Sequence, residues 1–253
     1  MLNKNLYKKF YTILNLKSIW KFTPPLVLVS YRKIRNFQRV LFAPISMNIN
    51  AKKYMNLILE SFPEFGSNSG SGRVLDIGAN FGYFTKACVD LGYSVTAVEP
   101  HPYAIKNLYR FFRGNTKVKI DNKAVSNVTG IIDLYLHPQH LLDQKNTSIR
   151  ASLVADKFST KNRLSVPVSS ILLSSYFENQ EHYSLVKIDI EGAEMYLVDD
   201  LIKFGARIDR LLLEKHSRFM MDSKLGEYYV VQMNKLDSYI AAHKWDKWST
   251  NWI

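Results

Sequence analysis

The sequence predicts an α/β protein with a doubly wound, mostly parallel, seven-stranded sheet and a helical N-terminal extension. Short apolar runs rich in β-branched residues alternate with longer stretches of helical length, and glycines follow several of these stretches. Strands separated by crossover helices form parallel sheets that are covered on both faces. Because such sheets bind ligands beyond the carboxyl ends of their strands, polar residues at those ends are the candidate site residues.

The expected elements alternate along the chain from residue 73. They are, in order, strand 73–77, helix 83–91, strand 94–98, helix 102–112, strand 118–120, two extended pieces at 130–136 and 164–168, strand 185–188, helix 193–204 and strand 210–213. Gly92 and Gly205 end two of the helices, and Pro102 begins another at a position where proline is tolerated. The two extended pieces exceed what a minimal strand–helix–strand unit needs.

Positive charge is concentrated at the start of the chain. Residues 1–59 hold eleven of the 34 basic residues and no acid, which leaves 23 basic against 22 acidic residues in the remainder. We therefore expect two domains, a basic, acid-free helical extension at 1–59 and a nearly neutral catalytic domain at 60–253. A nucleic-acid enzyme usually carries its positive field around the active site, so this distribution argues against nucleic acid as a partner.

The extension has two main open interpretations, and an acid-poor transit peptide is a third. Apolar residues recur at helical spacing from Leu6 to Trp20 with lysines between them, as expected for a helix that packs on the body or one that contacts an anionic membrane surface. The apolar stretch 19–31 is too short and interrupted to span a bilayer and has no secretory cleavage pattern. The expected localisation is cytoplasmic, with peripheral membrane contact as the alternative.

A glycine loop follows the first expected strand, with the sequence Asp76-Ile-Gly-Ala-Asn-Phe-Gly82. Gly78 permits a sharp turn and Gly82 permits close packing at the helix start. A dinucleotide site would read G-x-G-x-x-G, whereas this loop has one glycine fewer and an acid before it. Glu99 ends the next strand, where an acid can bind both ribose hydroxyls. The combination suits S-adenosylmethionine, which has a ribose and a cationic sulfonium but no phosphate.

Five motifs resemble those of the FkbM-type family of class I S-adenosylmethionine-dependent methyltransferases. They are Asp76-Ile-Gly-Ala-Asn-Phe-Gly82, Glu99-Pro-His-Pro102, Asn122-Lys-Ala124, Lys187-Ile-Asp-Ile-Glu-Gly-Ala-Glu194 and Leu213-Glu-Lys-His216. The resemblance implies a methyltransferase domain at 60–253 that methylates a hydroxyl of a sugar, glycan or related secondary metabolite. The cofactor contacts that it implies are Asp76, Gly78, Ala79, Asn80, Gly82, Glu99, Asn122 and Ala124.

Acids and a histidine gather at two later strand ends. Asp189 and Glu191 follow strand 185–188, and Glu214 and His216 follow strand 210–213. An alcohol loses its proton as it is methylated, and a carboxylate or imidazole can accept that proton. We expect Asp189 and His216 to do so, with Glu214 orienting the imidazole or the acceptor. The same acids suit a divalent cation, but no spacing requires one, so no metal site is assigned.

Two neighbouring residues are expected to have ordinary structural roles. Glu194 is expected to begin a helix, where its charge meets the positive end of the helix dipole. Lys187 is expected to be a strand residue that points away from the site.

Two rival functions remain as alternatives. A methyltransferase of nucleic acid, such as RNA, would carry an Asn/Asp-Pro-Pro-aromatic signature after strand 185–188 or a nucleophilic cysteine. The chain instead has Asp189-Ile-Glu-Gly192 there, and its one cysteine, Cys88, falls inside a helix. A non-catalytic interaction protein with the same fold would not need the acids at the strand ends. These features favour a small-molecule or glycan acceptor.

Overall fold

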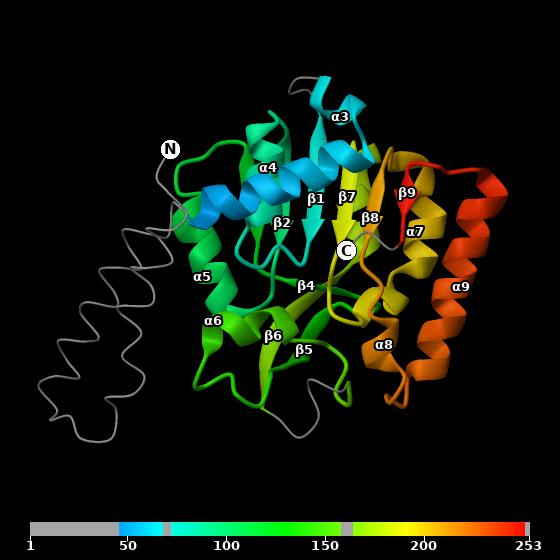
Figure 1. The fold of residues 1–253 in the computed structure, drawn as a ribbon. Coiled ribbons are helices and arrows are strands. Elements are labelled where there is room, and N and C mark those ends of the chain that lie inside the picture. The colour runs from blue at the N-terminus through cyan, green and yellow to red at the C-terminus, as the bar shows by residue number, and fades with distance from the viewer. Residues whose placement is uncertain (1–45, 68–71, 158–163, 251–253) are drawn as a thin grey trace, which may run out of the picture. The chain divides into compact units, whose positions relative to one another are not determined.

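The computed structural model describes residues 46–67, 72–157 and 164–250 (Figure 1). The amphipathic helix expected at 6–20 and the apolar stretch 19–31 lie outside the described residues. From Met47 onward, the described chain folds as one unit. Its helices include none that is both long and apolar enough to cross a membrane.

A six-stranded parallel sheet lies at the centre of this unit. Its strands are β1 (Arg73–Ile77), β2 (Ser94–Val98), β3 (Val118–Asp121), β7 (Leu185–Ile188), β8 (Leu211–Leu213) and β9 (Trp248–Ser249). They lie side by side in the order β3-β2-β1-β7-β8-β9, and every neighbouring pair is parallel. This is the doubly wound order, in which the winding reverses between β1 and β7. The predicted fold class is confirmed.

Helices connect the strands of the central sheet. They are α3 (Glu64–Ser67), α4 (Tyr83–Asp90), α5 (Pro102–Phe111), α6 (Gln144–Thr147), α7 (Val198–Phe204), α8 (Ser217–Met220) and α9 (Gly226–His243), with 3-10 turns η2 (Ser148–Arg150), η3 (Leu173–Gln180), η4 (Ala193–Tyr196) and η5 (Gly205–Arg207). The single helix predicted at 193–204 is instead η4 followed by α7. The break lies at Leu197, just after the turn in which the Glu194 carboxylate accepts hydrogen bonds from backbone N–H groups.

Both faces of the sheet are buried, and alternate strand residues belong to different core clusters. Val74 and Leu185 pack with α4 and with the helix that covers residues 46–61. Their neighbours Leu75 and Val186 pack on the other face with residues of α7 and α9. Because successive strand side chains point to opposite faces, the near-continuous apolar strands are explained by helices on both sides.

The strand count differs from the prediction. Six described strands form the central sheet, and a separate sheet has the order β4-β6-β5. Its strands are β4 (Ala124–Ser126), β5 (Gly130–Tyr135) and β6 (Ser165–Leu172). The extended pieces expected at 130–136 and 164–168 thus pair with each other in antiparallel orientation and do not join the central parallel sheet. In Figure 1 the small sheet lies beyond the arrowheads of β1 and β7.

Part of the basic extension belongs to the body. The helix at 46–61 places Ile58 fully inside a core cluster, with Tyr54, Met55 and Leu57 packed against that cluster. The predicted domain boundary between residues 59 and 60 therefore falls within a helix. The described part of the extension thus packs on the body, and contact of the extension with an anionic membrane stays a prediction.

Candidate functional site

A cavity of about 350 Å³ opens at the carboxyl ends of the central strands. Its walls come from the loops after β1, β2, β7 and β8, from residues 148–153, and from Tyr54 of the helix at 46–61. It therefore lies at the reversal point between β1 and β7, where doubly wound sheets bind their ligands. Its volume is within the range of sites for small ligands.

The glycine loop brings the ends of β1 and β7 into contact. Gly78 has a φ of +79°, and a Cβ at this residue would lie 1.8 Å from the Asp189 carbonyl oxygen. Only glycine combines this backbone conformation with so close an approach. Gly82 also has a φ of +79°, and a Cβ there would meet Leu108 and Phe112 of the next crossover. Gly78 lines the cavity, whereas Gly82 shapes it through packing.

Glu99 fixes the loop from the end of β2. Its carboxylate accepts hydrogen bonds from the backbone N–H groups of Asn80 at 2.8 Å and His101 at 2.7 Å. Asn80 has a positive φ of 47°, so this contact holds a conformation that non-glycine residues seldom adopt. Burial raises the pKa of Glu99 to about 7, although the two backbone hydrogen bonds oppose this rise. Glu99 lines the cavity, as the sequence predicts for a ligand-binding acid.

His101 is a cavity residue that the sequence analysis did not identify. Its Nδ1 accepts hydrogen bonds from backbone N–H groups at the start of α5. Its Nε2 is buried and has no hydrogen-bond partner within the described chain. Burial lowers the pKa of His101 to about 4, so the ring is neutral at physiological pH. With Nδ1 accepting, the proton is on Nε2, where it is available to a ligand.

Lys187 points into the site, contrary to the sequence expectation. Its Nζ donates to the Gly78 carbonyl oxygen at 2.8 Å and lies 3.5 Å from Asp76 Oδ1 and 3.3 Å from Asp189 Oδ2. Burial alone would lower the pKa of Lys187, but the Asp189 and Asp76 carboxylates raise it above its ordinary value. The apolar sequence of strand 185–188 does not indicate that Lys187 faces the site. The acids that pair with its ammonium group are Asp76, which is distant in sequence, and Asp189, which follows the strand.

Asp76 is fully buried and does not line the cavity. Its Oδ2 accepts a hydrogen bond from the Thr85 hydroxyl at 2.6 Å. Burial raises the pKa of Asp76, and the Lys187 ammonium opposes that rise. Asp76 therefore supports the glycine loop from below, through Lys187 and Thr85, rather than by direct exposure to a ligand.

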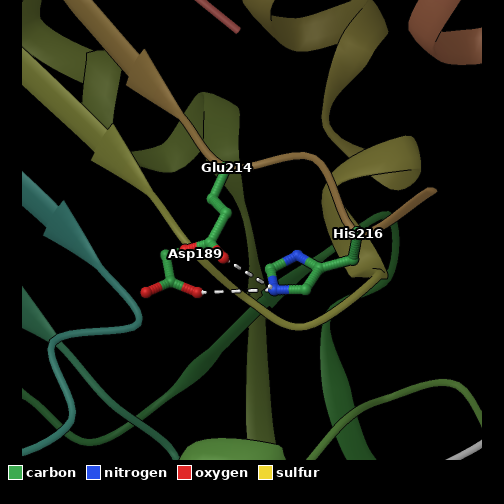
Figure 2. A group of neighbouring side chains, drawn as sticks. All are labelled: Asp189, Glu214 and His216. Carbon is green, nitrogen blue, oxygen red and sulfur yellow. Dashed lines mark ion pairs between the residues drawn. The ribbon is translucent and has the colours of Figure 1, made fainter. Parts of the chain in front are cut away.

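Three carboxylates converge on one imidazole nitrogen at the ends of β7 and β8. His216 Nε2 lies 3.9 Å from Asp189 Oδ1, 3.7 Å from Glu191 Oε1 and 3.6 Å from Glu214 Oε1. Figure 2 shows the Asp189 and Glu214 carboxylates pointing toward this nitrogen. All three distances exceed those of hydrogen bonds. The acids line the cavity, whereas His216 stands behind them and does not.

A fourth carboxylate orients His216 from the opposite side. Glu194 Oε1 lies 2.9 Å from His216 Nδ1 and also accepts the backbone N–H groups of Ile190 and Gly192. Burial alone would lower the pKa of His216, but Glu194 raises it to about 9, together with Glu191 and Asp189. Glu194 was expected only to begin a helix. It does so in η4, and it also fixes the imidazole.

Lys157 is another residue that the sequence analysis missed. Its side chain is buried, and its Nζ donates to the Glu191 carbonyl oxygen at 2.9 Å and also to the Glu191 carboxylate. Ser152 Oγ donates to the same carbonyl oxygen at 2.7 Å. These contacts hold Glu191 in a left-handed conformation with a φ of +59°. Because Lys157 lies in an irregular loop 34 residues before its partner, no local pattern identifies it.

The remaining predicted cofactor residues divide into two groups. Ala79, Asn80 and Ala124 line the cavity. Asn122 is exposed and lies outside the cavity lining, while its neighbour Lys123 is part of that lining. The tight turn in which the Lys123 N–H donates to the Asp121 carbonyl oxygen turns Asn122 outward.

Among the described residues, Asp189, Glu214 and His216 form a group that can offer one ligand atom each to a metal ion. The sequence analysis assigned no metal site and kept a divalent cation held by these acids as an alternative.

Comparisons with known proteins agree with the motifs. A family model described as the methyltransferase FkbM domain matches residues 76–220, more than half of the chain. A search of curated proteins finds no significant match. One similar solved structure is described as the plantazolicin methyltransferase BpumL in complex with SAH. It is 13% identical, the match covers 85% of this chain and 71% of that chain, and the TM-score is 0.35.

Replacing Lys187 tests the charge arrangement beneath the loop. We expect Lys187→Met to lower the free energy of unfolding by about 3–5 kcal/mol, because it leaves the buried Asp76 carboxylate without its cation. Urea denaturation measures this loss. The matched control is Lys86→Met, which breaks the exposed pair between Lys86 and Asp90 and should cost less than about 1 kcal/mol. Equal, small losses in both variants would contradict the buried-pair interpretation.

Proposed function

Because the chain belongs to the FkbM methyltransferase family, we propose that it transfers the methyl group of S-adenosylmethionine to a hydroxyl oxygen of a sugar, a glycan or a related secondary metabolite. The observation that carries this proposal is that Glu99 and the carboxylates of Asp189, Glu191 and Glu214 line one cavity. One acid is thus available for a ribose and three are available for an acceptor.

The cofactor half of the cavity suits a nucleoside without phosphate. An ionised carboxylate has about four lone-pair sites. The backbone N–H groups of Asn80 and His101 use two of those on Glu99, so two are left for the ribose hydroxyls. The buried Nε2 of His101 adds a hydrogen-bond donor in the same wall. Gly78 lets the ligand approach the backbone closely.

The acceptor half suits an alcohol. In the transfer, an oxygen lone pair forms the new C–O bond while the C–S bond breaks, its electron pair stays on sulfur, and the hydroxyl proton leaves to a base. Asp189, Glu191 and Glu214 reach the cavity, whereas His216 does not. We therefore assign proton acceptance to these carboxylates and treat His216 as the positioning residue that holds them. This differs from the sequence-based assignment of His216 as a base.

The charge of the acceptor half favours a neutral substrate over a polynucleotide. The side chains that meet an acceptor there are mostly acidic, and acids repel a phosphate backbone. A sugar hydroxyl instead forms hydrogen bonds with carboxylates without a charge penalty. Methylation also depends on holding the hydroxyl in line with the methyl group and the sulfur, and several carboxylates around one hydroxyl supply such positioning.

The assignment of Glu99 is tested by cofactor binding. We expect Glu99→Ala to weaken the binding of S-adenosylmethionine and S-adenosylhomocysteine by about 1–3 kcal/mol, because hydrogen bonds to a charged acceptor are lost. Titration calorimetry measures this, with the exposed acid Glu227→Ala as control. Because the pKa of Glu99 is about 7 in the free protein, the wild-type affinity should fall as the pH falls through 7 and the carboxylate becomes protonated. An unchanged affinity in folded Glu99→Ala would overturn the assignment.

The acceptor carboxylates are tested by turnover. We expect Asp189→Asn and Glu214→Gln to lower the rate of methyl transfer by roughly 10²–10⁴, the range typical of a positioned base, with little change in cofactor affinity. Transfer from labelled S-adenosylmethionine to a panel of sugars and glycosides measures the rate, and Asp133→Asn, an exposed acid on the small sheet, is the control. Full turnover in both variants, or methylation of nitrogen alone, would contradict the proposal.

A further inference from the structure

We infer that Asp189, Glu214 and His216 bind a divalent first-row transition-metal ion at the acceptor end of the cavity. The binding site is argued from the geometry of these side chains alone. Its catalytic use, polarising the acceptor hydroxyl, rests on the proposed function.

The three side chains surround a space of the right size for an ion. Each offers a ligand atom, and these atoms all lie within 4.8 Å of one another. The Nε2 nitrogen is 3.6 Å from Glu214 Oε1 and 3.9 Å from Asp189 Oδ1. Ligands about 2.0–2.2 Å from one metal ion stand roughly 3–3.6 Å apart. Because the ligand atoms lie within 4.8 Å of one another, side-chain movements of up to about 1 Å would close the site around an ion.

The imidazole independently indicates a ligand. The His216 side chain is 3% exposed, and its Nε2 makes no hydrogen bond within the described chain although it points between two carboxylates (Figure 2). Its other nitrogen is held by the buried Glu194 carboxylate at 2.9 Å. A carboxylate on the far nitrogen is the usual companion of a metal-bound histidine, because it fixes the ring and the tautomer.

Charge balance also favours a cation at this point. The carboxylates of Asp189, Glu191, Glu194 and Glu214 surround the histidine, and within the described chain the ammonium groups that contact them in this cluster are Lys187 and Lys157. Asp76 shares Lys187 at 3.5 Å, so five carboxylates face two ammonium groups here. A divalent ion would offset two of the three excess negative charges.

The donor set indicates the class of metal. One imidazole nitrogen with two carboxylate oxygens suits Mn²⁺, Fe²⁺ or Zn²⁺ better than Ca²⁺ or Mg²⁺, which prefer oxygen ligands alone. Asp189 and Glu214 line the cavity, so the open side of the site faces the acceptor. A hydroxyl bound there would lose its proton more readily. With Asp189 and Glu214 holding the ion, Glu191, which also lines the cavity, would accept that proton. The oxygen lone pair would form the C–O bond as the C–S bond breaks and its electron pair stays on sulfur.

The experiment is a titration of the metal-free, full-length protein with Mn²⁺ in the absence of cofactor and acceptor. Electron paramagnetic resonance measures the free and bound Mn²⁺ at each step. We expect one bound Mn²⁺ per chain, displaced by Zn²⁺. Asp189→Asn and Glu214→Gln should each weaken binding by at least about 10-fold, and Glu194→Gln by about 10–100-fold through loss of the histidine's orientation. Asp133→Asn is the control that should bind normally.

Three variants are used because removing the buried His216 itself threatens folding, and circular dichroism establishes that each variant is folded. Absence of Mn²⁺ and Zn²⁺ binding by the wild-type protein, or wild-type affinity in both folded Asp189→Asn and Glu214→Gln, overturns the metal site. Calorimetry with S-adenosylmethionine separates the two proposals. Binding of Mn²⁺ without binding of the cofactor leaves the metal site and removes the methyl-transfer proposal, and the reverse result removes the metal site alone.

Discussion

The buried ammonium of Lys187 joins the two strands whose ends form the site. It donates to the Gly78 carbonyl oxygen after β1 and lies beside the carboxylates of Asp76 and Asp189. Gly78 can approach β7 this closely because it has no Cβ, which would otherwise overlap the Asp189 carbonyl oxygen. Since burying a carboxylate without a cation is costly, Lys187 makes the fully buried Asp76 tolerable and sets the position of Asp189. The cofactor and acceptor halves of the cavity thus share one electrostatic support.

Elements outside the central sheet complete the site. Residues of the loop that follows the small sheet's strand β5, notably Ser152 and Lys157, hold Glu191 in place. Tyr54 contributes to the cavity wall from the helix at 46–61. The strand ends of the parallel sheet supply the acids of the cavity. The added segments hold one of these acids, Glu191, in place and complete the cavity wall.

Sequence reasoning succeeded where local pattern determines structure. The short, mostly apolar runs of β1 and β7, which are buried from Val74 to Ile77 and from Leu185 to Ile188, have a signal within a few residues. The same is true of the glycine at residue 78 and the acid at the end of β2. It failed where long-range contacts decide. Lys187 lies in an apolar strand and Lys157 in an irregular loop. Each forms an ion pair with an acid that is distant in the sequence, and the sequence alone does not show that the two are close. The described central sheet has six strands rather than the predicted seven for the same reason. The local sequence of residues 130–136 does not show which sheet these residues join.

The order of the side chains at the ends of β7 and β8 also depends on tertiary packing. His216 was expected to touch the acceptor because it follows β8. In the fold, Glu194 draws its ring behind the cavity wall, so that the carboxylates of Asp189 and Glu214 stand in front. This order of groups, with acids that line the cavity and an oriented imidazole behind them, underlies both the proposed alcohol acceptor and the proposed metal site.

Hydrogen–deuterium exchange of the full chain, with and without S-adenosylhomocysteine, tests the central claim that the reversal point between β1 and β7 is the cofactor site. We expect slower exchange in the ligand-bound protein at the backbone amides that line the cavity around Glu99, which are those of Gly78, Ala79, Asn80, Phe81, Glu99 and His101. Unchanged exchange at these amides, with protection confined to another part of the chain, would contradict this claim.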